Sequence, residues 1–374
     1  MADTPVEPGL TEPDLSGPDR TMTPVGFADL PGWADDDHPA ALRAFRRSAI
    51  KQKLPKTRAM GIRGEDFHVP FQAAIALGEA PSPDEARCFF ETWFRPHRIS
   101  TAGFVTGYFE PEVEASPART VAFNVPIHAR PPELVDVDDA NRPKGWDPQI
   151  RFAGRHDDRL MPYADRRSIE HGFLDGRGLE LAYLADPVDA FFVHIQGSAR
   201  LRMTDGSIRR VGFAGKTGHA YTSIGRLAVE RGHLALEDAD KDGLEAWFRA
   251  NPLAGRALMH ENRSYIFFRQ IAGLDPADGP VGAAGVSLTP LRSLAVDRTL
   301  MTFHTPVWVE AAELAIRRLM IAQDTGSAIV GPARGDIFFG SGPDAGANAG
   351  PVRHGASMTA LVPRPDAASP EAGI

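Results

Sequence analysis

The sequence predicts a mainly β fold built from short strands. The chain has 374 residues, enough for two domains, and its 36 glycines and 32 prolines favour frequent turns over long helices. Short apolar runs recur between turn residues in the C-terminal third of the chain, as expected for brief buried strands. These runs are residues 294–296, 306–309, 328–330, 337–339 and 358–361.

Two helices are expected in the N-terminal part. The first covers residues 40–51, where Leu42 and Phe45 lie on one apolar face. The second begins near Asp84 and carries a cluster of aromatic side chains that extends to Phe94. Because amphipathic spacing of this kind is typical of core packing, neither helix is expected to form the functional site.

The middle of the chain combines strands with further helices. Residues 104–114 have a β-rich, partly alternating pattern, and residues 191–203 predict a strand. The dipeptide Asp205-Gly206 is a hairpin turn signal, so residues 207–213 are expected to return alongside that strand. Two short helices are predicted after it, at residues 221–231 and 244–251.

Composition excludes several classes of function. The net charge is −8 with no long block of lysine or arginine, so nucleic acid is not an expected partner. The sequence contains no run of about 18 apolar residues, so no membrane-spanning helix is expected. Residues 1–19 show neither the basic start and apolar segment of a secretory signal nor a lipid-attachment cysteine.

Cysteine and histidine usage predicts no metal and no other cofactor. The single cysteine, Cys88, permits no disulfide within the chain and no cysteine-based metal site. We expect it to be buried on a helix face. His194, His219 and His304 are too scattered along the chain to suggest a metal site.

Residues 324–340 carry the clearest chemical signal, because two acids stand there among glycines that permit tight turns. Asp324 begins the sequence Asp-Thr-Gly-Ser, which is also the signature of an aspartic protease. That chemistry needs two such loops whose carboxylates share a proton, and the tripeptide occurs once. Asp336 precedes Ile337 and two phenylalanines, an apolar setting that raises the pKa of a carboxyl group.

Several motifs occur in a fixed order along the chain. They are Thr-Gly-Tyr-Phe-Glu-Pro (106–111), His-Ile-Gln-Gly-Ser-Ala (194–199), Phe-Ala-Gly-Lys-Thr-Gly-His-Ala-Tyr-Thr-Ser-Ile-Gly (213–225) and Asn-Arg-Ser-Tyr-Ile-Phe-Phe (262–268). Residues 295–297, 324–329 and 336–340 add the pattern of a 3D domain, which is named for three aspartates. With these motifs the chain resembles the membrane-bound lytic murein transglycosylase A (MltA) family from about residue 26 to residue 363.

The resemblance implies a fold and a domain plan. The implied fold is a double-psi β-barrel domain formed from both ends of the chain, with a second, inserted β-domain and a few peripheral helices. Under this plan the catalytic domain comprises residues 24–111 and 262–363, and the insert comprises residues 112–261. Residues 1–23 and 364–374 are expected to be disordered tails.

The resemblance also implies an activity. The family cleaves the β-1,4 bond between N-acetylmuramic acid and N-acetylglucosamine in peptidoglycan without hydrolysis and leaves 1,6-anhydromuramic ends, which makes it a lytic exotransglycosylase. The expected partner is therefore the peptidoglycan glycan strand, and the expected location is the periplasm, with or without attachment to the outer membrane. A non-catalytic glycan-binding or expansin-like wall-loosening protein is the alternative.

The resemblance assigns roles to individual residues. Asp336 is expected to be the catalytic acid and then the base, and Asp324 is expected to be a supporting carboxylate. A single acid suffices because the nucleophile is the sugar's own C6 hydroxyl, which is tethered to the reacting centre. The expected substrate-binding residues are Thr106, Gly107, Tyr108, Gln196, Gly197, Ser198, Lys216 and Tyr221.

Overall fold

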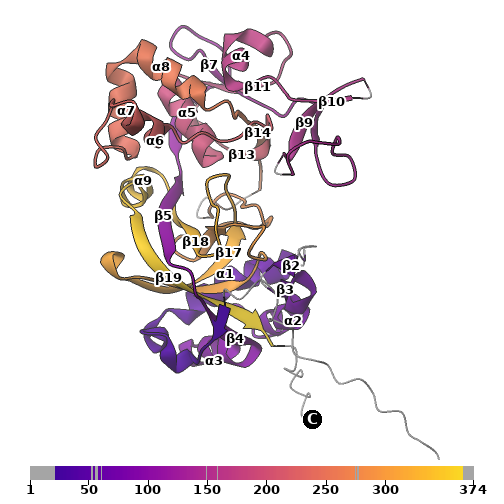
Figure 1. Cartoon of the computed structure of the whole chain (residues 1–374), viewed down its shortest axis with the longest axis vertical. Helices are drawn as coiled ribbons and strands as arrows, with labels where there is room; N and C mark the ends of the chain where they lie inside the picture. Colours follow the sequence, from indigo (N-terminus) through magenta and orange to yellow (C-terminus); the bar gives the residue numbers. More distant parts are fainter. Residues whose placement is uncertain are drawn as a thin grey trace, which may run out of the picture. The chain divides into compact units, whose positions relative to one another are not determined.

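The computed structural model describes residues 22–364, apart from residues 52, 53, 55–57, 60, 149, 158, 274, 276 and 277. Strands and shorter helices fill both of its compact units (Figure 1), so the predicted mainly β class with some helices is confirmed. Unit 1 comprises the chain up to Thr106, Val281–Phe338 and the chain from Arg353 onward. Unit 2 comprises Gly107–Pro280 and Phe339–Val352. Most of the two predicted tails lies outside the described residues.

Unit 1 is organised on an eight-stranded sheet. Its strands are β1 (Met22–Pro24), β4 (Phe94–Ile99), β5 (Gly103–Glu110), β15 (Ser293–Val296), β16 (Pro306–Ala311), β17 (Ile316–Asp324), β18 (Arg334–Ser341) and β19 (Arg353–Pro363). The strand order is β1-β4-β19-β16-β17-β15-β18-β5, and β5 also pairs with β19, which closes a ring of pairings. The pairing of β15 with β17 is parallel, whereas β15 pairs with β18 in antiparallel fashion. Strands β5 and β18 begin in unit 1 and end in unit 2.

Helices and the sheet of unit 1 share an aromatic core. Phe45, Phe90, Phe94 and Trp308 are completely buried, and the Phe45 and Phe94 rings meet nearly at right angles with centroids 5.6 Å apart. Both predicted N-terminal helices are present, although Phe94 begins β4 instead of extending the helix before it. The helices are α1 (His38–Lys51), α2 (His68–Ala76) and α3 (Pro83–Trp93), and a two-stranded ribbon of β2 (Arg58–Ala59) and β3 (Ile62–Arg63) accompanies them.

Unit 2 contains a six-stranded and a three-stranded sheet. The larger sheet has the order β14-β13-β12-β6-β11-β7, formed by β14 (Ile266–Ile271), β13 (Ile208–Lys216), β12 (Ser198–Met203), β6 (Glu112–Ser116), β11 (Glu180–Leu184) and β7 (Val125–His128). The smaller has the order β10-β9-β8, formed by β10 (Arg159–Met161), β9 (Phe152–His156) and β8 (Leu134–Asp136). The predicted hairpin at Asp205-Gly206 is confirmed, because β12 and β13 pair across it.

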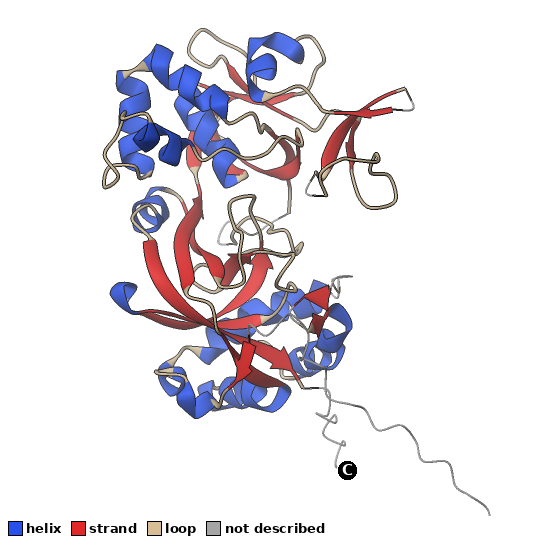
Figure 2. Ribbon diagram, in the orientation of Figure 1, coloured by secondary structure: helices blue, strands red, loops and turns tan. Residues whose placement is uncertain are grey.

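Helices α5 (Pro187–Gln196), α6 (Ile224–Glu230), α7 (Lys241–Ala250) and α8 (Pro252–Glu261) gather in unit 2 (Figure 2). They share one hydrophobic cluster, in which Phe248 is 1% exposed and packs against Phe191 with ring centroids 5.9 Å apart. Unit 2 also contains the single turn α4 (Arg166–Ser168), a π-helical turn at Ile169–Phe173 that follows it, and α9 (Pro343–Ala349).

Residues 191–203 do not form the single strand that the sequence predicts. Its first half, residues 191–196, belongs to helix α5, and its second half, residues 198–203, forms strand β12. Asp186 caps the start of the helix, Pro187 occupies its first turn, and Gly197 ends it with a left-handed φ of 76°. The Asp-Pro start and the glycine stop are therefore the signals that distinguish this buried helix from a buried strand.

Two smaller expectations are also wrong. Residues 328–330 form part of a turn between β17 and β18 and are not a strand. Cys88 is exposed on α3, where its sulfur lies 3.7 Å from Thr92 Oγ1. The aromatic side chains of α3, and not Cys88, therefore occupy its buried face.

A buried carboxylate ties together the strands of unit 2. Glu110, the last residue of β5, is completely buried and forms ion pairs with Arg200 on β12 at 3.1 Å and Arg210 on β13 at 2.9 Å. Ser341 Oγ donates a further hydrogen bond to Glu110 at 2.7 Å, and both arginines also donate to the carbonyl of Asp278. One buried arginine and one partly exposed arginine thus share this one acid as their counter-charge.

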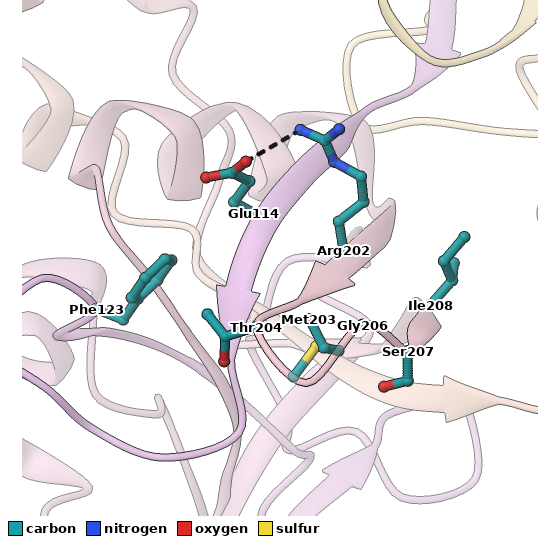
Figure 3. Close-up of a pocket in the computed structure, with 8 residues that line it drawn as sticks. All are labelled: Glu114, Phe123, Arg202, Met203, Thr204, Gly206, Ser207 and Ile208. Atoms are coloured by element: carbon teal, nitrogen blue, oxygen red, sulfur yellow. Dashed lines mark hydrogen bonds and ion pairs between the residues drawn. The ribbon is translucent and has the colours of Figure 1, made fainter.

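We predict that Glu110→Ala destabilises unit 2 by about 3–5 kcal/mol, because it leaves two guanidinium groups without their buried counter-charge. Calorimetric or urea unfolding checks this. The matched control is Glu114→Ala on β6, since Glu114 is paired with Arg202 at 3.3 Å (Figure 3). Both side chains of this pair are largely exposed. The control should cost about 1 kcal/mol or less. If both variants lose the same free energy of unfolding, the buried ion pairs of Glu110 stabilise the protein no more than the exposed pair does.

Candidate active site

Asp336 lies on β18 within a hydrogen-bonded group of side chains in unit 1. Its carboxyl is half-buried, and the following Ile337 and Phe338 are completely buried. Thr106 Oγ1, on β5, donates a hydrogen bond of 2.5 Å to Asp336 Oδ1. Arg334 Nη2 in turn donates to Thr106 Oγ1 at 2.8 Å. The acid is therefore held on one oxygen by a hydroxyl group from a strand that is distant in the sequence.

The environment of Asp336 suits a proton donor. Burial is the largest influence and raises the pKa of Asp336 to about 6. The hydrogen bond from Thr106 and the positive charge of Arg334 lower this pKa, whereas the negative charge of Asp324 raises it further. A carboxyl group with a pKa near 6 is protonated in mildly acidic solution and can also act as a base once it is ionised.

Asp324 is the last residue of β17 and is fastened to the backbone. Its Oδ1 accepts hydrogen bonds of 2.9 Å from the amides of both Ala283 and Thr325. Thr325 Oγ1 donates to the carbonyl of Val296 at 2.8 Å, which fixes the turn after the strand. Two N–H donors on one oxygen stabilise the charged carboxylate, so Asp324 is suited to supply a fixed negative charge.

A β-bulge brings the two acids to the same level of the sheet. Ala295 on β15 pairs with Asp336 on one side and with Asp324 on the other. Its neighbour Leu294 pairs with Ala322, so Gln323 is the extra residue of β17. Two strand spacings separate the Cα atoms of the acids, which corresponds to about 10 Å. In regular pairing Gln323, and not Asp324, would lie opposite Ala295.

Asp297, the third acid of the 3D pattern, has a structural task that the sequence did not indicate. It is 8% exposed, and its Oδ1 accepts hydrogen bonds from the amide and the hydroxyl of Thr299 at 3.0 and 2.6 Å. Its Oδ2 accepts from the amide of Gly331 at 3.0 Å. Asp297 thus connects the turn after β15 to the turn that precedes β18.

Some predicted binding residues have structural tasks in unit 2. A Cβ on Gly107 would approach the backbone of Ala349 to 2.7 Å, so only glycine fits there. Gln196 ends α5, and its Oε1 accepts a hydrogen bond of 3.3 Å from the amide of Phe109. Gly197 supplies the left-handed helix stop, and Ser198, 9% exposed, begins β12. These four residues shape the backbone around the end of α5 and β5.

The remaining predicted residues of unit 2 are half-buried polar side chains. Tyr108 follows Gly107 on β5, and Lys216 is the last residue of β13. Tyr221 lies in the loop before α6, where burial raises the pKa of its hydroxyl. Within unit 1, the structure brings Thr106, Asp324 and Asp336 together, and Arg334 is the member of this group that the sequence did not reveal.

Two surface hollows lie away from the predicted residues. One of about 410 Å³ is formed in unit 2 at the β12–β13 hairpin, where Figure 3 shows Phe123, Met203 and Ile208 around it. Another of about 740 Å³ lies in unit 1 near the starts of α1 and β17. Neither hollow is lined by Asp336 or Asp324.

The described part of the chain offers no cluster of three or more histidine, cysteine, aspartate or glutamate side chains arranged to hold a metal ion. Within the same residues, every helix is too short or too polar to span a membrane.

Two family models match the sequence. The MltA specific insert domain matches residues 104–269, and the 3D domain matches residues 292–362. The crystal structure of a membrane-bound lytic murein transglycosylase from Agrobacterium tumefaciens superposes on the present structure with a TM-score of 0.86, and the two sequences are 43% identical. This likeness covers 92% of the present chain and 98% of the other.

Curated relatives point to the same family. Membrane-bound lytic murein transglycosylase A of Vibrio cholerae is 36% identical over 50% of this chain and 53% of its own length. The Escherichia coli protein of the same name is 31% identical over 70% of this chain and 66% of its own length. The matched part thus spans about half to two thirds of these relatives.

We predict that Asp336→Asn stabilises the protein at pH 8 by about 1–3 kcal/mol, because it removes a carboxylate that burial disfavours. The folded pKa, about 6, exceeds the ordinary value of 3.8, so the penalty on the wild type develops as pH rises from about 4 to about 6. Urea unfolding at pH 3.5 and pH 8 checks this, and the gain should vanish at pH 3.5.

The control for this measurement is Asp35→Asn, which changes an exposed aspartate of unit 1. It should alter stability by no more than about 0.5 kcal/mol at either pH. A pH-independent effect of Asp336→Asn would mean that the carboxyl is not strained by burial.

Proposed function

This chain belongs to the MltA family, and from that membership we propose that it is a lytic transglycosylase acting on peptidoglycan glycan strands. The proposed reaction cleaves the β-1,4 bond between N-acetylmuramic acid and N-acetylglucosamine and leaves a 1,6-anhydromuramic end. One observation carries the proposal. Burial raises the pKa of the Asp336 carboxyl to about 6, which fits one group that serves as both acid and base.

The proposed cycle uses Asp336 twice. Its protonated carboxyl gives a proton to the glycosidic oxygen while the bond from that oxygen to C1 of the muramic residue breaks. The resulting carboxylate takes the proton of the C6 hydroxyl as O6 bonds to C1. The acid is thereby restored, and no water enters the products. Because the C6 hydroxyl is already attached to the reacting sugar, little entropy is lost in positioning it, whereas a water molecule would have to be bound and oriented.

Asp324 is proposed as a charge-supplying residue and not as a second acid or base. Glycosidases that hydrolyse their substrate use two carboxylates, one of which activates water or attacks the sugar. Two backbone amides already donate to Asp324 Oδ1, so this oxygen is engaged within the protein. Its negative charge favours the protonated form of Asp336 and stabilises positive charge that develops on the sugar ring.

The remaining assignments are also proposals. Thr106 is proposed as a residue that orients Asp336, since its hydroxyl is engaged by the acid. The proposed substrate-binding group comprises Gly107, Tyr108, Gln196, Gly197, Ser198, Lys216 and Tyr221. Because peptidoglycan lies outside the cytoplasmic membrane, we propose a periplasmic location. The relatives are named membrane-bound, and we propose that the membrane in question is the outer one.

We propose that the ring of strand pairings in unit 1 is a double-psi β-barrel, which the parallel β15–β17 pair supports. The proposed catalytic domain comprises residues 24–111 and 262–363, and the proposed insert comprises residues 112–261. This division is the one that the sequence motifs imply. The compact units divide the chain differently, because unit 2 comprises Gly107–Pro280 and also Phe339–Val352.

Digestion of purified murein sacculi followed by mass spectrometry tests the activity. We expect products lighter than hydrolytic muropeptides by one water, and reducing ends in their place would identify a hydrolase. Asp336→Asn should lower the rate by at least about 100-fold, the usual contribution of a general acid. Binding of sacculi without release of fragments would favour the non-catalytic alternative.

Asp324→Asn is the matched comparison, because it changes the neighbouring acid in the same way. It should retain measurable activity. An inactive Asp324→Asn together with an active Asp336→Asn would reverse the two roles.

We predict that kcat/KM falls as pH rises through about 6, because the acid must be protonated to begin the cycle. Asp324→Asn should move this limb to lower pH, since removing a nearby negative charge lowers the pKa of Asp336. Initial rates on soluble glycan fragments between pH 4 and 9 measure both effects. If the pH dependence of kcat/KM is unchanged in Asp324→Asn, the charge of Asp324 does not influence the pKa of Asp336.

A further inference from the structure

Four side chains of unit 1 lie on two neighbouring strands. Phe104 and Thr106 are two residues apart on β5, and Arg334 and Asp336 are two residues apart on β18. Residues two apart on a strand point to the same face, and β5 and β18 are adjacent in the sheet. The group is therefore built by strand register and does not depend on a loop.

The hydrogen bonds in this group have a fixed direction. The guanidinium of Arg334 can only donate, so Thr106 Oγ1 must accept in the 2.8 Å bond between them. The single hydroxyl proton of Thr106 is then directed to Asp336 Oδ1 at 2.5 Å. Because Oδ1 accepts this proton, the titrating proton of the acid is assigned to Oδ2.

We propose that Arg334 is a positioning residue for the catalytic acid: acting through Thr106, it commits Oδ1 of Asp336 to accepting a hydrogen bond and leaves Oδ2 to carry and deliver the proton. This inference rests on the proposed function.

The alternative arrangement shows why an arginine is useful here. Without it, the Thr106 hydroxyl can rotate and accept the proton of a neutral Asp336, which withdraws that proton from the substrate. With Arg334 present, such a rotation would point the hydroxyl proton at a cation. The arginine thereby removes an unproductive state of the protonated acid.

Arg334 is itself well fixed. Its guanidinium carbon lies 5.5 Å from the ring centroid of Phe104, and its other terminal nitrogen, Nη1, donates to the carbonyl of Gly335. Stacking on an aromatic ring adds about 0.5–1 kcal/mol at an exposed site, and Phe104 is 43% exposed. These contacts hold the donor toward Thr106 independently of the acid.

The positive charge also serves the second half of the cycle. Arg334 favours ionised Asp336, which opposes the effect of burial. One carboxyl that must first give and then take a proton works best when neither form is strongly favoured. The arginine thus balances the two halves of the reaction.

A double-mutant cycle of Arg334→Met and Thr106→Val tests the proposal. We expect Arg334→Met to lower kcat at pH 5 by about tenfold in the wild-type background and to have little effect in the Thr106→Val background. An equal loss in both backgrounds, or none in either, would overturn a role exerted through Thr106. Circular dichroism and thermal unfolding confirm that each variant is folded.

The pKa of Asp336 gives a readout that is independent of activity. Carbon-13 NMR titration of labelled aspartate, assigned with Asp336→Asn, should show a rise of about one unit in Arg334→Met. Arg334→Lys, which keeps the charge and a donor, should stay close to the wild-type pKa. The control Arg317→Met removes an exposed arginine at the start of β17 and should leave the pKa unchanged.

The two measurements separate the two hypotheses. If the wild type yields no anhydro products, the proposed function fails, and the NMR titration still shows whether Arg334 controls Asp336. An unchanged pKa in Arg334→Met, with anhydro products from the wild type, would overturn the inference and leave the proposed function standing.

Discussion

The hydrogen bond between Thr106 and Asp336 is the interaction on which the candidate site depends. It joins residues that are 230 positions apart, and it forms only because β5 lies beside β18 in the sheet. That adjacency requires the N-terminal strands, the C-terminal strands and the ring of pairings between β5 and β19 to be complete. The setting of the acid therefore exists only in the complete sheet, and no local segment contains the site.

The chemistry of Asp336 reflects opposing influences, of which burial is the largest. Burial alone favours the neutral carboxyl, and a nearby carboxylate adds to that preference, whereas a hydroxyl donor and an arginine favour the ion. The resulting pKa, about 6, lies within reach of both forms. Asp324 has a different environment, because two backbone amides donate to its Oδ1. Two aspartates that flank the same strand, β15, thus differ in environment through their hydrogen-bond donors and not through their residue type.

Sequence patterns predicted the features that are local. The apolar flank of Asp336, the hairpin at Asp205-Gly206 and the two N-terminal helices all follow from short-range composition. The pattern failed at residues 191–203, where a buried helix and a buried strand have the same apolar character and only the caps distinguish them. Arg334 and its link to Thr106 could not be predicted, because the register that joins β5 to β18 is set by the whole ring of strands.

The bulge at Gln323 has a consequence for how this segment tolerates changes in length. Gln323 anchors α1 through hydrogen bonds to Ala44 and Ser48, while Asp324 occupies the same level of the sheet beside Asp336. Loss of Gln323 would leave the carboxylate opposite Ala295 and detach the helix, whereas an added residue would displace the carboxylate and spare the helix. A change of one residue in this strand therefore alters either the attachment of the N-terminal helix or the position of a charge, so each of the two features can change without the other.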